Sequence, residues 1–295
     1  MRIGFLCSIG WSIHSVYDGL TKELYKHQID TSIINIDNHR TLFEWRQLIR
    51  HYDYFMAPSG PEFLKVYKKA NIPDKQLILI AHAPWEISNM VEKYGPTTFD
   101  TYAGIFCVSN RIKKLSESLG VTANVKVVQN GVIFERYCCE PSKKLTRIGY
   151  GYPINNPHGW KRSYITKMLD FTIQTPPSFL PFTIMREFYK NIDASLLFST
   201  ITEACGLINL EAAAAGRLIM STDVGILEDY PDAPAVRLRM RDKDMVEDIY
   251  KSIEYYKNND DKFHRKCVAT QEFAREYYSW DHAVKSWLTA LNSVL

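Results

Sequence analysis

Two glutamates with seven residues between them are the strongest chemical feature of this sequence. Glu203 falls in a predicted loop, and Glu211 in a predicted helix that begins near Gly206. This spacing lets the two side chains reach different parts of one extended ligand rather than share a proton. Ionised carboxylates accept hydrogen bonds from vicinal hydroxyls, which a sugar and a ribose both offer. The pair therefore indicates hydroxyl recognition. On the residues alone, a solvated loop glutamate and a helix-surface glutamate are an equal alternative.

The elements around these glutamates also favour a ligand site. An apolar run at 194–198 predicts a buried strand that ends just before the loop. In open α/β sheets, ligands bind beyond the carboxyl ends of the strands. A helix that starts at Gly206 and Leu207 presents free backbone N–H groups and a positive dipole end, which suit an anion such as a diphosphate.

The remainder of the chain predicts an α/β fold. Short β-rich runs alternate with helical patterns, which is typical of parallel strands joined by crossover helices. Val16, Leu20 and Leu24 repeat at four-residue spacing in the first helix, and Ser109 is a predicted N-cap of a later one. The expected strands are 3–7, 31–36, 54–57, 77–81, 104–108 and 125–128 in the first half, and 146–149, 171–174, 194–198, 218–221 and 235–238 in the second.

We expect two domains and a separate last helix. Asn130 and Gly131 form a turn signal, and the segment 138–144 loses periodicity. This segment places the domain boundary, so the expected domains are 1–140 and 141–278. The chain from Asp244 onward predicts helices with breaks near 258–261 and 278–280. The last helix, 279–295, is expected to pack back onto the first domain.

Composition and charge exclude several classes of protein. The chain has 36 Lys and Arg against 33 Asp and Glu, so its net charge of +3 gives no field that points to nucleic acid or a membrane. No apolar run approaches the roughly 18 residues that cross a bilayer, and the start lacks an export pattern. Six scattered cysteines without metal-like spacing suit free buried thiols in a reducing compartment. We expect a cytoplasmic protein, and a viral protein acting in a host cytoplasm would have the same features.

Several motifs in order resemble one enzyme family. The segment from Glu203 to Glu211, with Gly206-Leu207 inside it and Gly216 after it, resembles the signature of retaining glycosyltransferases of the family-4 type, which have the GT-B fold. Three further stretches match that family: the Gln129-Asn130-Gly131-Val132 turn, the strand and Ser-capped helix at 106–115, and the aromatic-Ser-Trp at 278–280. The resemblance covers nearly the whole chain and implies two Rossmann-like domains that face each other across a cleft, with C-terminal helices.

The resemblance also implies roles for single residues of the second domain, which would bind the nucleotide sugar. Glu203 would bind hydroxyls of the transferred sugar, Glu211 the nucleotide ribose, and the amides of Gly206 and Leu207 the diphosphate. Lys161, supported by Arg162, stands where the family has a phosphate-binding Lys. Fixed cations stabilise the charge that develops on the leaving diphosphate, so no metal is expected. A solvated helix start is the other interpretation of these two cations.

In the first, acceptor-side domain the resemblance implies two further contacts. His82 follows the apolar run 77–81, at a place where family members often have a His beside the transferred sugar. A packed core histidine is an equal alternative. Gly10 fits a glycine-rich turn that touches donor and acceptor. The family's Arg after the first strand of the second domain is absent at Tyr150, so Arg147 or Arg162 is a candidate to supply that charge. The second domain is also short between Gln174 and Phe188.

The expected function is transfer of a hexose from a nucleotide-diphosphate sugar, with UDP or GDP as the nucleotide, to an acceptor hydroxyl with retention of configuration. No cofactor is expected. The acceptor is open between a polysaccharide, a lipid, a small metabolite and a modified DNA base, so nucleic acid enters only as a glycosylation substrate. The alternatives are a GT-B nucleotide-sugar epimerase or phosphorylase, and a non-catalytic sugar-nucleotide-binding protein in which loop aromatics such as Trp11, Trp85 and Trp160 bind the ligand.

Overall fold

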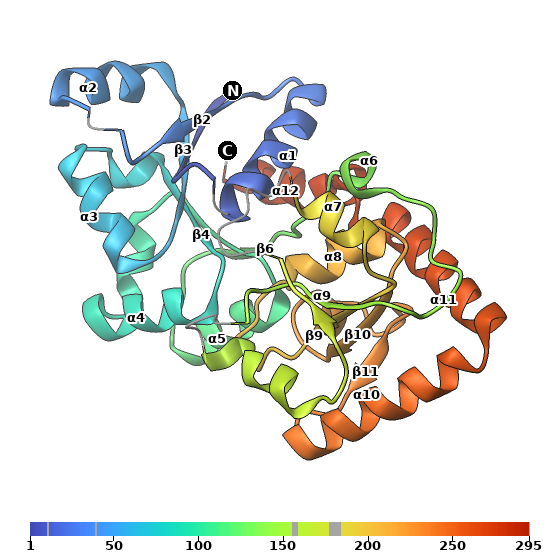
Figure 1. Cartoon of the computed structure of the whole chain (residues 1–295). Helices are drawn as coiled ribbons and strands as arrows, with labels where there is room; N and C mark the ends of the chain where they lie inside the picture. Colours follow the sequence, from blue (N-terminus) through green and yellow to red (C-terminus); the bar gives the residue numbers. More distant parts are fainter. Residues whose placement is uncertain (11, 39, 155–158, 177–183, 295) are drawn as a thin grey trace. The chain divides into compact units, whose positions relative to one another are not determined.

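The computed structural model describes residues 1–10, 12–38, 40–154, 159–176 and 184–294. The expected aromatic contact Trp11 lies outside these residues, as do 155–158, in the loop before Lys161, and 177–183, in the short segment of the second domain. The chain forms two compact units (Figure 1). Unit 1 contains Met1–Gly131 and Ala283–Leu295, and unit 2 contains Val132–His282.

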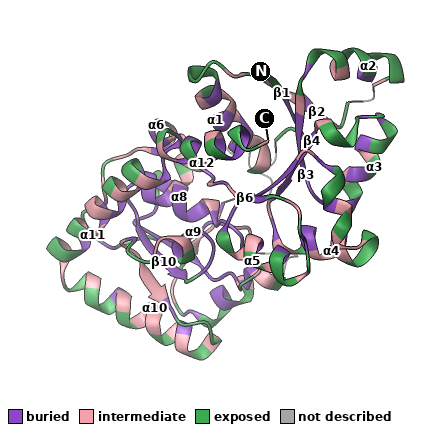
Figure 2. Ribbon diagram, turned by 180° about the vertical axis from the view of Figure 1, so that it is seen from behind, coloured by how far each residue is buried: buried purple, intermediate pink, exposed green. Residues whose placement is uncertain are grey.

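Unit 1 is a parallel six-stranded sheet with the strand order β2-β1-β3-β4-β5-β6. Its core strands are continuous apolar runs, because both faces of a parallel sheet are covered. All five residues of β4 are buried, for example, and Figure 2 shows β1, β3 and β4 in the colour of buried residues. The strands are β1 (Arg2–Cys7), β2 (Asp30–Asn35), β3 (Tyr54–Pro58), β4 (Leu77–Ala81), β5 (Gly104–Cys107) and β6 (Val125–Val127).

The helices of unit 1 start at local sequence signals. Thr41 and Glu44 form a capping box at the start of α2, and the Ser109 hydroxyl accepts from the amide of Ile112 in α5, as predicted. The apolar stripe of α1 is buried at Val16 and Leu20 as expected. The helices are α1 (Ser12–Lys26), α2 (Leu42–His51), α3 (Pro61–Lys69), α4 (Pro84–Tyr94) and α5 (Asn110–Ser118), with short 3₁₀ turns at Asp74–Gln76 and Pro96–Thr101.

The end of the chain belongs to unit 1. The last helix, α12 (Trp280–Asn292), reaches unit 1 from Ala283 onward. Trp287 is fully buried, donates from Nε1 to the Gln129 carbonyl at 2.7 Å, and packs edge-on against Phe106. Burial of this indole therefore holds the C-terminal helix on the domain that the sequence assigns to it.

Unit 2 is a parallel five-stranded sheet with the order β11-β10-β9-β7-β8. Its strands are β7 (Ile148–Tyr150), β8 (Ile173–Gln174), β9 (Ala194–Leu197), β10 (Leu218–Thr222) and β11 (Val236–Leu238). Its helices are α6 (Phe134–Tyr137), α7 (Met185–Lys190), α8 (Leu207–Ala214), α9 (Ile226–Asp229), α10 (Asp242–Lys257) and α11 (Asp260–Phe273), followed by a π-helical turn at Ala274–Tyr278; 3₁₀ turns lie at Gly159–Lys161 and Ser163–Met168. All eleven predicted strands are confirmed within a few residues at each end.

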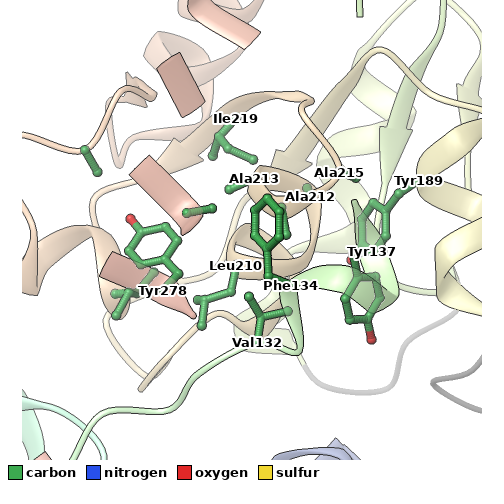
Figure 3. Packing of buried hydrophobic residues seen from close by; sticks show 14 of the residues in the cluster. Val132, Phe134, Tyr137, Tyr189, Leu210, Ala212, Ala213, Ala215, Ile219 and Tyr278 are labelled. Atoms are coloured by element: carbon green, nitrogen blue, oxygen red, sulfur yellow. The ribbon is translucent and has the colours of Figure 1, made fainter. Parts of the chain in front are cut away.

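Hydrophobic residues cover both faces of this second sheet. Successive side chains of a strand point to opposite faces, so Leu218 and Met220 of β10 join one apolar cluster and Ile219 joins the other. The Ile219 cluster holds the alanines of α8 together with Phe134 and Tyr137 of α6 (Figure 3). Because α6 packs there, the chain enters unit 2 at Val132, whereas the loss of periodicity at 138–144 predicts a boundary at 140.

Candidate functional site

The strand order of unit 2 defines where a ligand site is expected. β7 pairs with β8 on one side and with β9 on the other, and all these pairings are parallel. The connections that leave β7 and β9 therefore diverge at the carboxyl edge of the sheet, which is a topological switch point, and open α/β sheets bind ligands at such points. Lys161 follows β7 and Glu203 follows β9.

The structure brings Lys161 and Glu203 together at this edge as an ion pair. The Lys161 Nζ lies 2.5 Å from Glu203 Oε2, and the two residues are each only 7% exposed. The ammonium also donates to the Tyr152 hydroxyl and lies 3.9 Å from the ring centroids of both Tyr152 and Trp160. A carboxylate and two aromatic faces thus surround one buried cation, and cation–π contacts of this kind strengthen when they are desolvated.

Glu203 accepts hydrogen bonds from four donors. Lys161 and the Tyr152 hydroxyl, at 3.3 Å, come from the segment that follows β7. The Ser199 hydroxyl, at 2.9 Å, and the Gly206 amide, at 3.2 Å on Oε1, come from the segment that follows β9. The carboxylate therefore joins two loops that meet at the switch point, and it occupies one of the amides that the sequence assigns to a diphosphate.

Burial governs the protonation of the groups around this pair. Desolvation lowers the pKa of Lys161, and the charge of Glu203 opposes that shift. Burial raises the pKa of Tyr152 well above its ordinary value, and the charges of Glu203 and Glu211 raise it further. Tyr152 is therefore a neutral hydroxyl at physiological pH, and both carboxylates act on it.

Gly206 forms the start of α8 in a conformation that other residues adopt at a cost. Its φ is +70°, in the left-handed region, and a Cβ there would lie 3.2 Å from Leu197 Cδ2. The carbonyl of Gly206 accepts from the amide of Asn209, which closes the first turn. Gly206 and Leu207 thus lie at the N-terminal end of α8 as predicted, with the side chain of Leu207 packed on the core.

Glu211 lies in α8 within a separate group of hydroxyl donors. Tyr137 of α6 donates to Oε1 at 2.9 Å, and Tyr189 of α7 donates to Oε2 at 2.8 Å. Figure 3 shows these two tyrosines beside each other. Burial raises the pKa of Glu211 to about 7, against lowering effects from the two tyrosines and Arg136. The structure thus gives Glu203 a charged partner and Glu211 two neutral ones.

The structure places the other candidate cations of unit 2 outside the Lys161 pair. Arg162 donates to Asp242 in the first turn of α10 and to the Tyr164 hydroxyl at 3.4 Å. Arg147 lies 3.5 Å from Asp193. Each guanidinium is therefore engaged by a carboxylate that is remote in sequence.

In unit 1, His82 lies at the carboxyl end of β4 and half-buried. Its Nε2 is 3.0 Å from the Tyr17 hydroxyl, and its backbone amide donates to Glu86 Oε2 at 2.9 Å. Ser59, after β3, donates to the same oxygen at 2.9 Å. Desolvation lowers the pKa of His82 to about 4 and raises that of Glu86 to about 7. Gly10 lies in the exposed turn after β1, with a φ of +93°.

Several residues of these sites are absent from the predictions made on the sequence. Tyr152 and Ser199 each lie two residues beyond the end of a strand, β7 and β9 respectively. Polar residues at that offset from neighbouring predicted strands could have been proposed as partners of Glu203. Tyr137 and Tyr189 gave no such signal, because a tyrosine in a helix is equally typical of a packed core.

Within the part of the chain that the structure describes, no group of three or more His, Cys, Asp or Glu side chains could hold a metal ion. No helix among the same residues is long and apolar enough to span a bilayer. The described cysteines are all free thiols, and four of them are buried.

Two parallel-sheet α/β units of this kind have the GT-B fold, and comparison with known proteins agrees. No family profile matches the chain, and no curated protein matches its sequence. Similar solved structures include HepE of Anabaena in complex with UDP and glucose, at 14% identity and a TM-score of 0.68 over 99% of this chain and 100% of that one. Sucrose-phosphate synthase of Thermosynechococcus elongatus is similar at 10% identity and a TM-score of 0.70 over 100% and 99%.

A third similar structure is the catalytic domain of starch synthase IV of Arabidopsis thaliana bound to ADP and acarbose, at 9% identity and a TM-score of 0.68 over 99% of both chains. At such low identities the likeness establishes the fold alone. The predicted fold class, two α/β domains of the GT-B type followed by C-terminal helices, is therefore confirmed.

Proposed function

We propose that this chain transfers a hexose from a nucleotide-diphosphate sugar to an acceptor hydroxyl. The observation that carries the proposal is the buried Lys161–Glu203 pair at the switch point of unit 2, where the α8 N-terminus also lies. A cation and a helix N-terminus at one sheet edge suit a diphosphate. The fold supports the same conclusion, because the solved structures of similar fold include proteins bound to UDP with glucose and to ADP.

Lys161 is the proposed phosphate ligand. An ammonium has three N–H donors, and the Lys161 ammonium gives one to Glu203 and one to Tyr152. One N–H is left for an oxygen of the leaving diphosphate. As the glycosidic bond breaks, negative charge grows on that oxygen, and a cation already held in place stabilises it without reorganisation. Glu203 keeps the ammonium in position and is the proposed acceptor for hydroxyls of the transferred sugar.

The finer features of the reaction belong to this proposal as well. Glu211 is the proposed ribose ligand, since each of its oxygens accepts one tyrosine hydroxyl and has a second lone pair available. Arg162 is proposed to support Lys161 at the phosphate, and Gly10 to form a turn that touches donor and acceptor. His82 is the proposed contact to the sugar. The proposed transfer needs no metal and uses UDP or GDP as the nucleotide. The family-4 resemblance implies retention of the anomeric configuration, and the protein is proposed to act in the cytoplasm.

The test starts from donor screening. Thermal shift with UDP- and GDP-sugars identifies the donor, because a ligand that binds only the folded state raises Tm. With that donor, transfer to a panel of sugars, lipids, metabolites and DNA is followed by nucleotide release, and NMR of the product reads its anomer. An inverted product would reject retention. If the protein converts the donor to an epimer when no acceptor is present, the transfer reaction is rejected in favour of isomerisation.

Variants then test the site itself. Lys161→Gln is expected to lower kcat by about a hundredfold or more, the range for loss of one preorganised electrostatic contact. The control is Lys190→Gln, because Lys190 is an exposed cation of the same unit on α7; it should keep full activity. Activity of Lys161→Gln that equals the control, at a temperature where both are folded, would remove the basis of the proposal.

A further inference from the structure

The hydroxyl of Tyr17 is buried with a single partner. Tyr17 lies in α1, is 0% exposed and packs against Phe5. Among the described residues, its only hydrogen-bond partner is His82 Nε2, at 3.0 Å. A buried hydroxyl that donates to nothing loses the free energy of a hydrogen bond, so buried donors are almost always satisfied.

From this geometry we infer that Tyr17 is a positioning residue that holds His82 as the Nδ1–H tautomer, so that His82 presents a hydrogen-bond donor to the bound sugar and not a base. The Tyr17 O–H donates to Nε2, and a neutral imidazole with an acceptor at Nε2 carries its proton on Nδ1. This inference rests on the proposed function only where it names the sugar. The tautomer itself is a property of the free protein.

The surroundings keep the imidazole neutral and fixed. Desolvation lowers the pKa of His82 to about 4, so the ring carries one proton at neutral pH. Burial raises the pKa of Tyr17 well above its ordinary value, so the phenol stays a donor. Glu86, in the first turn of α4, accepts from the backbone amide of His82 and so fixes the main chain from which the ring projects.

The consequence for chemistry is specific. Among the described residues, Nδ1 of His82 has no hydrogen-bond partner. The residue is half-buried, so part of its surface is accessible to solvent. An Nδ1–H can donate to a lone pair of a sugar hydroxyl oxygen. It cannot take a proton from that hydroxyl, because the lone pair of the ring is already directed at Tyr17. A general-base role for His82 is therefore excluded in this arrangement.

The direct test is ¹⁵N NMR of protein labelled in its histidine rings, since the shift of each ring nitrogen reports whether it carries a proton. The signal of His82 is assigned by its absence from His82→Asn. At pH 7 the wild-type protein should show Nδ1 protonated and Nε2 unprotonated. Tyr17→Phe should shift the ring toward Nε2–H. A wild-type spectrum with Nε2 protonated would overturn the inference. A Tyr17→Phe spectrum identical to that of the wild type would overturn it as well.

Tyr67→Phe is the matched control. Tyr67 is another buried tyrosine of unit 1, and its hydroxyl donates to the Pro58 carbonyl at 3.3 Å and not to His82. Loss of this hydroxyl should leave the His82 spectrum unchanged. A change of equal size in both variants would show a general loosening of unit 1 and would overturn the positioning role.

Kinetics separates the inference from the proposed function. The amide N–H of Asn can stand in for Nδ1–H, so His82→Asn should retain more activity than His82→Ala. Tyr17→Phe should lower kcat by about tenfold, less than the roughly hundredfold expected from loss of a whole donor. Equal activity of the Asn and Ala variants would contradict donation. Absence of transfer with every donor would reject the proposed function, while the NMR result would still decide the tautomer.

Discussion

The ion pair of Lys161 and Glu203 gives the sharpest energetic prediction. At an effective dielectric near 20, opposite charges about 4 Å apart attract by roughly 4 kcal/mol, and desolvation of two buried ions offsets most of that gain. The pair should thus contribute little net stability, since each residue is only 7% exposed. Removal of one partner leaves the other charge buried and uncompensated, so Lys161→Met or Glu203→Gln alone should cost about 3–5 kcal/mol. The double variant should recover most of that loss.

Native-state hydrogen exchange is the suitable assay, because exchange of amides in β7 and β9 reports the free energy of opening of unit 2 itself. The control cycle uses Lys190→Met and Glu187→Gln, whose side chains are 38% and 58% exposed on α7. A pair that is exposed to this extent should show almost no coupling. Single substitutions at Lys161 and Glu203 that each cost under about 1 kcal/mol, with effects that add as at independent sites, would refute this account of the ion pair.

Three further predictions concern other parts of the chain. Burial raises the pKa of Glu211 to about 7, so folding favours the protonated carboxyl. The free energy of unfolding of the wild type should therefore fall by about 3 kcal/mol as the pH rises from the ordinary pKa of a glutamate to 7. Urea unfolding of Glu211→Gln should show a flatter dependence on pH. Gly225→Ala should destabilise unit 2 strongly, because a Cβ there would lie 2.5 Å from the Cys205 carbonyl oxygen. Gly159→Ala should be nearly neutral in thermal melts, because no atom of the described residues lies within 4 Å of a Cβ added there. Trp287→Ala should cost unit 1 about 3–5 kcal/mol by exchange of the β5 amides, and a loss below 1 kcal/mol would contradict the packing of α12.

The sequence predicts most of the strands well because they are short apolar runs between turn signals. β4, for instance, consists entirely of aliphatic side chains and is buried throughout. The domain boundary is a different kind of feature. The polar segment 138–144 marks a change in local composition, but Phe134 and Tyr137 before it pack into the core of unit 2. Which core an aromatic side chain joins depends on contacts far away in sequence, and these leave no local pattern.

The same limit applies to the site. Lys161 and Glu203 are both candidates on the sequence through the family resemblance, and the structure shows that they follow neighbouring strands of one parallel sheet. The partners of the neighbouring Arg162 could not be predicted from the sequence. Arg162 pairs with Asp242 in a helix that begins 80 positions later, and no spacing rule connects the two. A side chain's type and its distance from a strand end can be read locally, but whether it faces a ligand or a distant carboxylate is decided by tertiary contacts.

The two glutamates show how such contacts divide one residue type into two functions. Glu203 lies against an ammonium at 2.5 Å, so its negative charge is matched and it can hold a cation for a phosphate. Glu211 meets two phenolic hydroxyls, and its pKa of about 7 means that protonated and ionised forms coexist at neutral pH. A carboxylate accepts from both hydroxyls of a ribose, whereas a protonated carboxyl has lost one acceptor position to its own proton. If Glu211 is the ribose ligand, nucleotide binding should therefore weaken below pH 7.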